Sequence, residues 1–213
     1  PLDFRGELYR HTLMTPFFNP GPSPFGPPRV FLGGVGAAMT AVAGEVADGL
    51  FVHPMNSPAF IRGTTLPALA TGLARSGRTR AALTVACQAL VITGYSAEEY
   101  QHADTTTRMQ LAFYGSTPQY RVVLETHGWG ELQPELNVLA KQGRWLEMAG
   151  LIDDRMLDAF TVRCEHPADV AAALHARYDG LVDRIAVLCH ADPHRAHPEA
   201  WAEVVAAIRR NGG

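Results

Sequence analysis

Short apolar runs alternate with longer segments of helical periodicity along most of the chain. Four runs rich in aliphatic, β-branched and aromatic residues predict buried strands at residues 30–32, 50–52, 83–93 and 184–189. Because helical segments separate these runs, we expect the strands to pair in parallel through right-handed crossovers. Few polar positions interrupt the runs, which predicts a sheet that is covered on both faces.

Two helices are predicted between the first three strands. The first covers residues 37–47, and the second begins at Ser57, an N-cap followed by proline, and runs to about Arg75. The first helix carries its large apolar side chains on one face, which we expect to point inward. That face consists of Met39, Val42, Ala43 and Val46.

Further helices are predicted on either side of the last strand. Ser96 and Glu99 have the spacing of a capping box, and a mostly helical pattern continues from there to about Asp158. His166 and Pro167 are expected to open another helix, which runs through Leu174. An amphipathic helix is expected over residues 198–210.

The segment before the first strand is rich in proline. Residues 14–28 hold six prolines, each of which fixes φ and removes a backbone donor, so residues 1–28 are expected to form an extended connection. The chain also opens without an initiator methionine. We therefore expect it to be part of a longer protein.

The composition is that of a globular domain. Of the 213 residues, 47% are hydrophobic and 18% charged, and the formal net charge of −3 argues against a nucleic-acid-binding protein. No apolar run approaches the ~18 residues of a membrane span. The three cysteines suit a reducing compartment. We expect a single cytoplasmic domain, residues 1–213, that acts on a small molecule and binds neither nucleic acid nor membrane.

A glycine-rich turn joins the first strand to the first helix. The segment Gly33-Gly34-Val35-Gly36 would let backbone N–H groups approach an anion at a helix N-terminus, which predicts phosphate binding. The alternative is that the glycines only form a tight turn. A dinucleotide fingerprint fits poorly, because Met39 replaces the third small residue and the second strand ends at His53 instead of an acidic residue.

Two further groups of residues could contribute to a site. His53 follows the second strand, at the sheet end where parallel α/β folds bind ligands, so it could orient a cofactor or cap its own loop. Tyr114, Tyr120, His127 and Trp129 surround glycine breaks in the helical stretch, where they could form a pocket wall. Packing between helices is the simpler interpretation of this second group.

A histidine-rich loop follows the last strand. Residues 190–197 contain three histidines and one aspartate, which are metal-ligand types. Pro193 and Arg195 interrupt them and no second ligand cluster exists, so a polar loop without metal is the better interpretation. Cys87 and Cys189 fall in predicted strands and are expected to be small core residues.

Three segments together carry a family resemblance: residues 32–39, residues 43–49 and residues 113–118. With them the chain resembles the luciferase-like monooxygenase superfamily, in the branch of oxidoreductases that depend on the deazaflavin coenzyme F-420. The resemblance covers nearly the whole chain. It implies an α/β fold of the TIM-barrel (βα)8 type, in which the four predicted strands are the fifth to eighth and residues 95–160 are a helical insertion. Because the first four units are absent, completion by a second copy or by a missing N-terminal half is expected.

The resemblance also implies a site and an activity. The cofactor-binding residues would be Gly33, Gly34, Val35, Gly36, Ala37 and His53, and His53 is the best candidate for a catalytic residue. The substrate-side residues would be Asn56, Ser57, Tyr114, Ser116 and Trp129. The implied activity is hydride transfer between coenzyme F-420 and a small organic substrate. Two alternatives remain open: an FMN-dependent monooxygenase, and a non-catalytic truncated barrel that dimerises or binds flavin.

Overall fold

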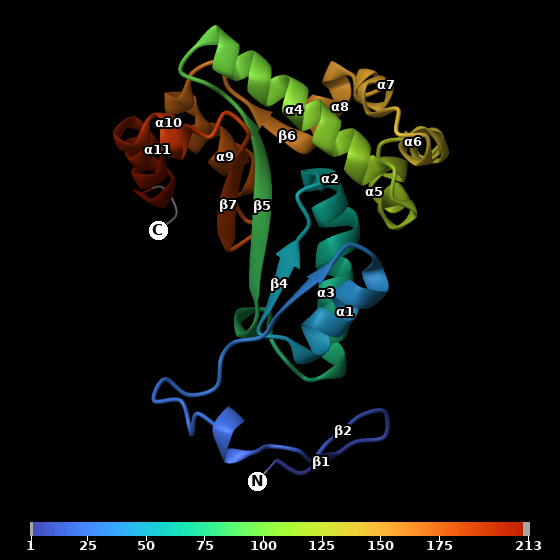
Figure 1. The fold of residues 1–213 in the computed structure, drawn as a ribbon, viewed down its shortest axis with the longest axis vertical. Helices are drawn as coiled ribbons and strands as arrows, with labels where there is room; N and C mark the ends of the chain where they lie inside the picture. Colours follow the sequence, from blue (N-terminus) through green and yellow to red (C-terminus); the bar gives the residue numbers. More distant parts are fainter. Residues whose placement is uncertain (1, 211–213) are drawn as a thin grey trace.

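A five-stranded parallel sheet forms the centre of the molecule (Figure 1), in a computed structural model that describes residues 2–210. The strands are β3 (Phe31–Gly34), β4 (Gly49–Val52), β5 (Thr84–Ile92), β6 (Thr161–Arg163) and β7 (Arg184–Cys189). β3 pairs with β4, β4 with β5, and both β6 and β7 with β5, all in parallel. The four predicted strands and their parallel pairing are confirmed.

The long strand β5 organises the sheet. Its residues 86–87 pair with both β4 and β7, which therefore lie on opposite edges of β5. Leu90 pairs with both β6 and β7, so β6 continues the β4 edge beyond the end of β4. Figure 1 shows this arrangement, with β4 and β6 on one side of β5 and β7 on the other.

Three short strands were not predicted from the pattern. β6 has only three residues and directly follows a helix, so neither its length nor a glycine or proline marks it. Within the proline-rich segment, β1 (Phe4–Arg5) and β2 (Arg10–His11) form a small antiparallel hairpin, and a 3-10 turn, η1, covers Pro16–Phe18. The remainder of that segment is an extended connection.

Helices cover the outer face of the sheet and the insertion stands at its carboxyl end (Figure 1). Outside the insertion, the helical segments after β3 are α1 (Ala37–Val46), α2 (Pro58–Phe60), the π-helical η2 (Ile61–Thr65), α3 (Leu66–Arg75), η3 (Arg80–Ala82), η5 (Pro167–Asp169), α9 (Val170–Tyr178), α10 (Pro193–Ala196) and α11 (Pro198–Arg210). The insertion contains α4 (Ala97–Gly115), η4 (Pro118–Tyr120), α5 (Arg121–Glu125), α6 (Leu132–Lys141), α7 (Trp145–Gly150) and α8 (Asp154–Phe160). In the described residues, no helix is long and apolar enough to cross a membrane.

The predicted buried face of the first helix is confirmed at Ala43 and wrong at Met39, Val42 and Val46. In α1 the residues Thr40, Ala41, Ala43 and Gly44 are buried, whereas Met39, Val42 and Val46 are exposed. The reason is the close approach of α1 to α3. A Cβ added at Gly72 would lie 1.8 Å from the Ala41 carbonyl oxygen, so only small side chains fit between the two helices.

Two clusters of buried side chains stabilise the fold. The first lies between the outer face of the sheet and the helices α1, α3, α9 and α11. The second joins Leu90 and Ile92, at the carboxyl end of β5, to the insertion. Arg108 fixes the insertion by bonding the Asp104 carboxylate (Nε–Oδ1, 2.7 Å) and the Ile152 carbonyl (Nη1–O, 2.6 Å).

The inner face of the sheet is largely open, which corrects the expectation of a sheet covered on both faces. The Phe51 side chain, central on this face, is 54% exposed, while its neighbour Leu50 on the outer face is fully buried. Among residues 2–210, β3 pairs only with β4 and β7 only with β5. Within the described residues, the sheet therefore forms an arc with two free edges.

Candidate functional site

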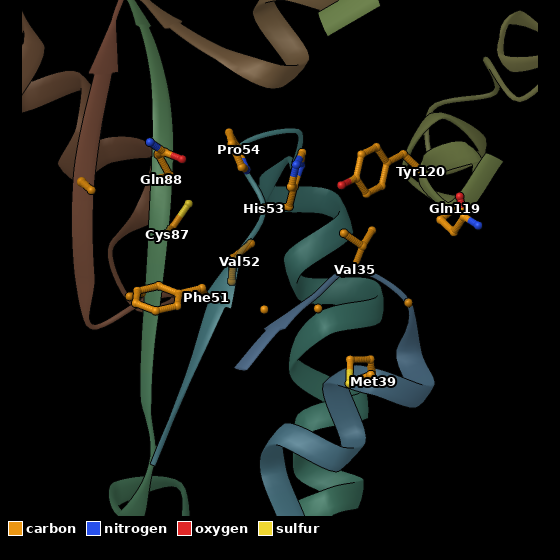
Figure 2. Close-up of a pocket in the computed structure, with 15 residues that line it drawn as sticks. Val35, Met39, Phe51, Val52, His53, Pro54, Cys87, Gln88, Gln119 and Tyr120 are labelled. Atoms are coloured by element: carbon orange, nitrogen blue, oxygen red, sulfur yellow. The ribbon is translucent and has the colours of Figure 1, made fainter. Parts of the chain in front are cut away.

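A cavity of about 720 Å³ lies against the inner face of the sheet, where β3 and β4 end. Figure 2 shows its wall, with residues from β3, β4, β5, β7, α1 and the η4 turn of the insertion. The lining residues are Gly33, Gly34, Val35, Gly36, Met39, Phe51, Val52, His53, Pro54, Ala86, Cys87, Gln88, Gln119, Tyr120 and Ala186. In the part of the chain that the structure describes, no Asp, Glu, Lys or Arg lines this cavity.

The glycine turn forms one end of the cavity. Gly36 is the N-cap of the ten-residue helix α1, and no side chain caps the N–H groups of its first turn. These unpaired donors and the positive end of the helix dipole suit an anion. A Cβ added at Gly33 would meet no atom within 4 Å, so the glycine leaves a flat backbone surface facing open space. Ala37 lies at the first position of α1 but does not line the cavity.

His53 is held in one orientation at the cavity wall. Its Nδ1 accepts a hydrogen bond from the Met55 backbone N–H (3.1 Å). Its ring contacts those of Tyr114 (4.6 Å between centroids) and Tyr120 (4.4 Å). Burial lowers the pKa of His53 to about 4, so the imidazole is neutral near pH 7. Because Nδ1 acts as an acceptor, the proton resides on Nε2, which can donate to a ligand.

Asn56 and Ser57 do not line the cavity, although they follow His53 closely. Both are 1% exposed. The Asn56 amide donates to the His53 carbonyl oxygen (2.6 Å) and lies 3.4 Å from the Cys87 sulfur. The Ser57 hydroxyl accepts from the Phe60 N–H (3.1 Å), which confirms the predicted N-cap, and pairs with His127 Nε2 (2.8 Å). Their contacts support the loop that carries His53.

The predicted substrate residues of the insertion are divided between the site and helix packing. Tyr114 contacts the His53 ring, and its hydroxyl accepts from the Gln110 amide (2.8 Å). Ser116 is buried and donates to the Phe113 carbonyl (2.7 Å). Trp129 stacks on His127, with ring centroids 5.0 Å apart. The structure therefore brings Tyr114 next to the cavity and leaves Ser116 and Trp129 in the packing of the insertion.

Several cavity residues were missed from the sequence. Phe51, Ala86 and Gln88 face inward because they share the strand parity of Gly33: the sheet register places Gly33 opposite Phe51 and Phe51 opposite Ala86. Alternation from Gly33 is thus the signal that could have found them. Gln119 was also missed, whereas its neighbour Tyr120 was among the residues considered for a pocket wall; both come from the η4 turn of the insertion (Figure 2).

The histidines of the loop after β7 diverge. His190 Nε2 lies 2.6 Å from Gln110 Oε1, and His197 Nε2 lies 2.7 Å from Glu99 Oε1. His194 contacts Asp192. Among residues 2–210, no group of three or more His, Cys, Asp or Glu side chains is arranged to hold a metal ion.

Parallel βα units with a cavity at the carboxyl ends of the strands are the arrangement of the βα-barrel class, in which ligands bind at that end. The chain belongs to the luciferase-like monooxygenase family, whose model matches residues 1–184. The family resemblance predicted from the glycine turn and its neighbouring segments is thereby confirmed.

Relatives support this assignment. An uncharacterized protein of Mycobacterium tuberculosis, Rv1360, is 54% identical over 185 residues, which are 86% of this chain and 54% of that protein. An F-420-dependent glucose-6-phosphate dehydrogenase of Nakamurella multipartita is 28% identical over 151 residues, covering 71% of this chain and 37% of that enzyme. The chain thus spans about half the length, or less, of these relatives.

Solved structures share the fold. The coenzyme F-420-dependent tetrahydromethanopterin reductase of Methanopyrus kandleri matches with a TM-score of 0.60 at 24% identity, over 75% of this chain and 44% of its own. An F-420-dependent secondary alcohol dehydrogenase matches with a TM-score of 0.67 at 14% identity, over 98% of this chain and 56% of its own. At these identities the likeness concerns the fold alone.

Proposed function

We propose that this chain forms the cofactor-binding part of an oxidoreductase that transfers a hydride between coenzyme F-420 and a small organic substrate. The observation that carries the proposal is the cavity itself: it joins an uncapped helix N-terminus to a flat glycine surface on the open face of the sheet. Relatives named as F-420-dependent glucose-6-phosphate dehydrogenase and 5,10-methylenetetrahydromethanopterin reductase, at 28% and 27% identity, favour the deazaflavin.

The residues of the cavity fit such a cofactor. The backbone N–H groups at the start of α1, from Gly36 onward, would bind the phosphate of its tail. Gly33 would let the planar ring approach the backbone, and Met39 and Phe51 would supply apolar surface around it. The Gln88 amide can bond polar atoms at the edge of the ring. When bound, the deazaflavin supplies the hydride chemistry, and the protein orients it and excludes water.

His53 has a defined chemical capacity in this site. With Nδ1 occupied by the Met55 N–H, its Nε2 carries a proton that can be donated to an oxygen of the substrate. A neutral donor of this kind stabilises partial negative charge on a carbonyl oxygen without introducing a full positive charge. The absence of charged side chains among the described lining residues also suits an uncharged organic group. We propose His53 as the substrate-orienting donor.

Anaerobic titration of the protein with coenzyme F-420, followed by the cofactor's own fluorescence, tests the proposal. Saturable binding that is tighter than binding of FMN is expected. Oxygen consumption with reduced FMN would instead support the monooxygenase alternative. Binding of either cofactor without turnover of any alcohol or aldehyde offered would favour the non-catalytic alternative.

A further inference from the structure

A second cavity, of about 520 Å³, lies apart from the candidate cofactor site and shares no lining residue with it. Its wall comes from α2, η2, α8, β6 and α9. Three of the lining side chains are arginines, Arg62, Arg163 and Arg177, and among the described lining residues Asp158 is the one carboxylate. The cofactor cavity has no charged lining residue in the described chain, whereas this one has an excess of two positive charges and room for a small organic ligand.

The acidic side chains around this cavity are already engaged by arginines. Asp158 Oδ1 lies 2.9 Å from Arg163 Nη1. Asp104 and Asp154 lie 4.0 and 3.8 Å from Arg163 Nη2. Both of these carboxylates also pair with Arg108. The excess positive charge of the cavity therefore belongs to its other two arginines.

Neither of those two arginines pairs with a carboxylate of the described residues. Arg177 Nη1 donates to the Asp158 carbonyl oxygen (3.1 Å), and Nη2 donates to the Ala159 carbonyl oxygen. These bonds hold the guanidinium in place and use one N–H of each nitrogen, so the second N–H of each remains available to a ligand. The exposed Arg62 side chain makes no hydrogen bond or ion pair with a described residue.

A π-helical turn presents Arg62 to the cavity. Residues 58–75 run as one helical segment, in which η2 separates α2 from α3. Ile61 and Thr65 of this turn are buried, whereas Arg62 points to the surface and lines the cavity. Turns of this kind are rare and recur at functional sites, because they present side chains that a regular α-helix would place elsewhere.

We propose that this cavity is a second binding site, for a small phosphate-bearing molecule held by the guanidinium groups of Arg62 and Arg177. Guanidinium groups match the geometry of phosphate oxygens and bind them with two parallel N–H bonds. Val162, Ala173 and Ala176 line the same cavity and would contact the organic part of a phosphate ester. Because Arg177 is already fixed by α8, little side-chain entropy is lost there on binding. The inference does not rest on the proposed function.

Titration of the ¹⁵N-labelled protein with inorganic phosphate, at constant ionic strength set with chloride, tests the inference. Saturable shifts are expected at residues 58–62, 161–163 and 173–177 and at the Nε–H groups of Arg62 and Arg177, half-complete at about 1 mM or below. Tighter binding of phenyl phosphate would assign the site to phosphate esters, and tighter binding of inorganic phosphate would assign it to the free ion. Shifts confined to residues 36–39 would place phosphate in the cofactor cavity and overturn the inference, as would the absence of saturable shifts. None of these results depends on whether coenzyme F-420 binds.

Three substitutions of surface charges sharpen the test. Arg62→Gln should weaken phosphate binding about ten-fold or more with unchanged far-UV circular dichroism, because the side chain has no described partner to lose. Arg75→Gln is the matched control: it removes the same charge from α3, where Arg75 lies 3.9 Å from Glu45, and should bind phosphate normally. Asp158→Asn removes the competing carboxylate and should strengthen binding several-fold. An equal loss in both arginine variants would reveal a general effect of net charge and contradict the site.

Discussion

The outer face of the sheet packs in the hydrophobic core, whereas its inner face lines the cavity. On β4, Leu50 is buried in the outer core, whereas the next residue, Phe51, is half exposed and lines the cavity. On β5, Val85 is buried in the outer core, while Gln88 lines the cavity. The outer face therefore stabilises the fold and the inner face builds the site. Substitutions should divide accordingly, into those that change the free energy of unfolding and those that change binding.

Two glycines illustrate this difference, because the space that a side chain would fill is used differently at each. At Gly72 on α3, the Ala41 carbonyl oxygen of α1 occupies that space. At Gly33, no atom lies within 4 Å of that space, which belongs to the cavity. The first glycine permits packing, and the second leaves room for a ligand.

The largest effect is expected from Gly72→Ala. The added Cβ would lie 1.8 Å from a backbone oxygen, so α1 and α3 must separate. We expect a loss of about 3 kcal/mol in the free energy of unfolding, at the upper end for overpacked cores. Urea denaturation measures it. Gly63→Ala is the control: it meets no atom within 4 Å and should be neutral or stabilise by up to about 1 kcal/mol.

Gly33→Leu should weaken F-420 binding and leave the stability of the fold nearly unchanged. The side chain enters the cavity, so the free energy of unfolding should change by less than about 1 kcal/mol while F-420 binding weakens roughly 10- to 100-fold. Fluorescence titration checks the binding. Gly150→Leu, at an open position at the end of α7, should bind normally. Unchanged F-420 affinity in Gly33→Leu would show that the cofactor does not bind in this cavity.

The free energy of unfolding should depend on the protonation of His53 at acidic pH. Its ordinary pKa is 6.5, and burial lowers the pKa to about 4 in the folded chain. Between these values the unfolded chain binds more protons, so stability should fall as the pH drops from 6.5 to 4. Because the ring is partly exposed, we discount the loss to on the order of 1–2 kcal/mol. Urea midpoints across this range should fall less steeply in His53→Phe than in the wild type, and an equal slope would contradict the neutral imidazole.

The smallest effect is expected from Gln88→Ala. Gln88 lies on the exposed inner face and has no buried contact to lose, so stability should be unchanged. Loss of one hydrogen bond to the cofactor should cost about 1 kcal/mol, a roughly five-fold weaker affinity. Isothermal titration with F-420 measures it. A loss of stability comparable to that of Gly72→Ala would show that the inner face also holds the fold together.

The comparison of faces also explains what the sequence could and could not predict. The four main strands and the glycine turn follow from apolar runs and turn residues, which are local signals. The open face does not, because Leu50, Phe51 and Val52 are all apolar and a pattern without alternation does not tell inside from outside. Asn56 and Ser57 were assigned to the substrate side through the family resemblance, but both are buried and neither lines the cavity. Their position after the strand did not determine whether they face the cavity.

For the insertion, the sequence left a pocket wall and helix packing open as alternatives and could not decide between them. Tyr120 lies against His53 only because the helices after α4 fold back over the sheet. Such a contact depends on the packing of elements far apart in sequence, which helical periodicity does not report. The predicted buried face of α1 was wrong at Met39, Val42 and Val46 for the same reason, since the approach of α3 favours small residues there.

The central claim is that the inner face of the sheet, from the glycine turn to His53, binds a deazaflavin. Titration of the ¹⁵N-labelled protein with coenzyme F-420, followed by amide chemical shifts, tests it most directly. The account predicts saturable shifts concentrated at residues 33–39 and at His53, with the outer-face residues Leu50 and Val85 little changed. Shifts confined to the outer helices, or none at saturating cofactor, would contradict it.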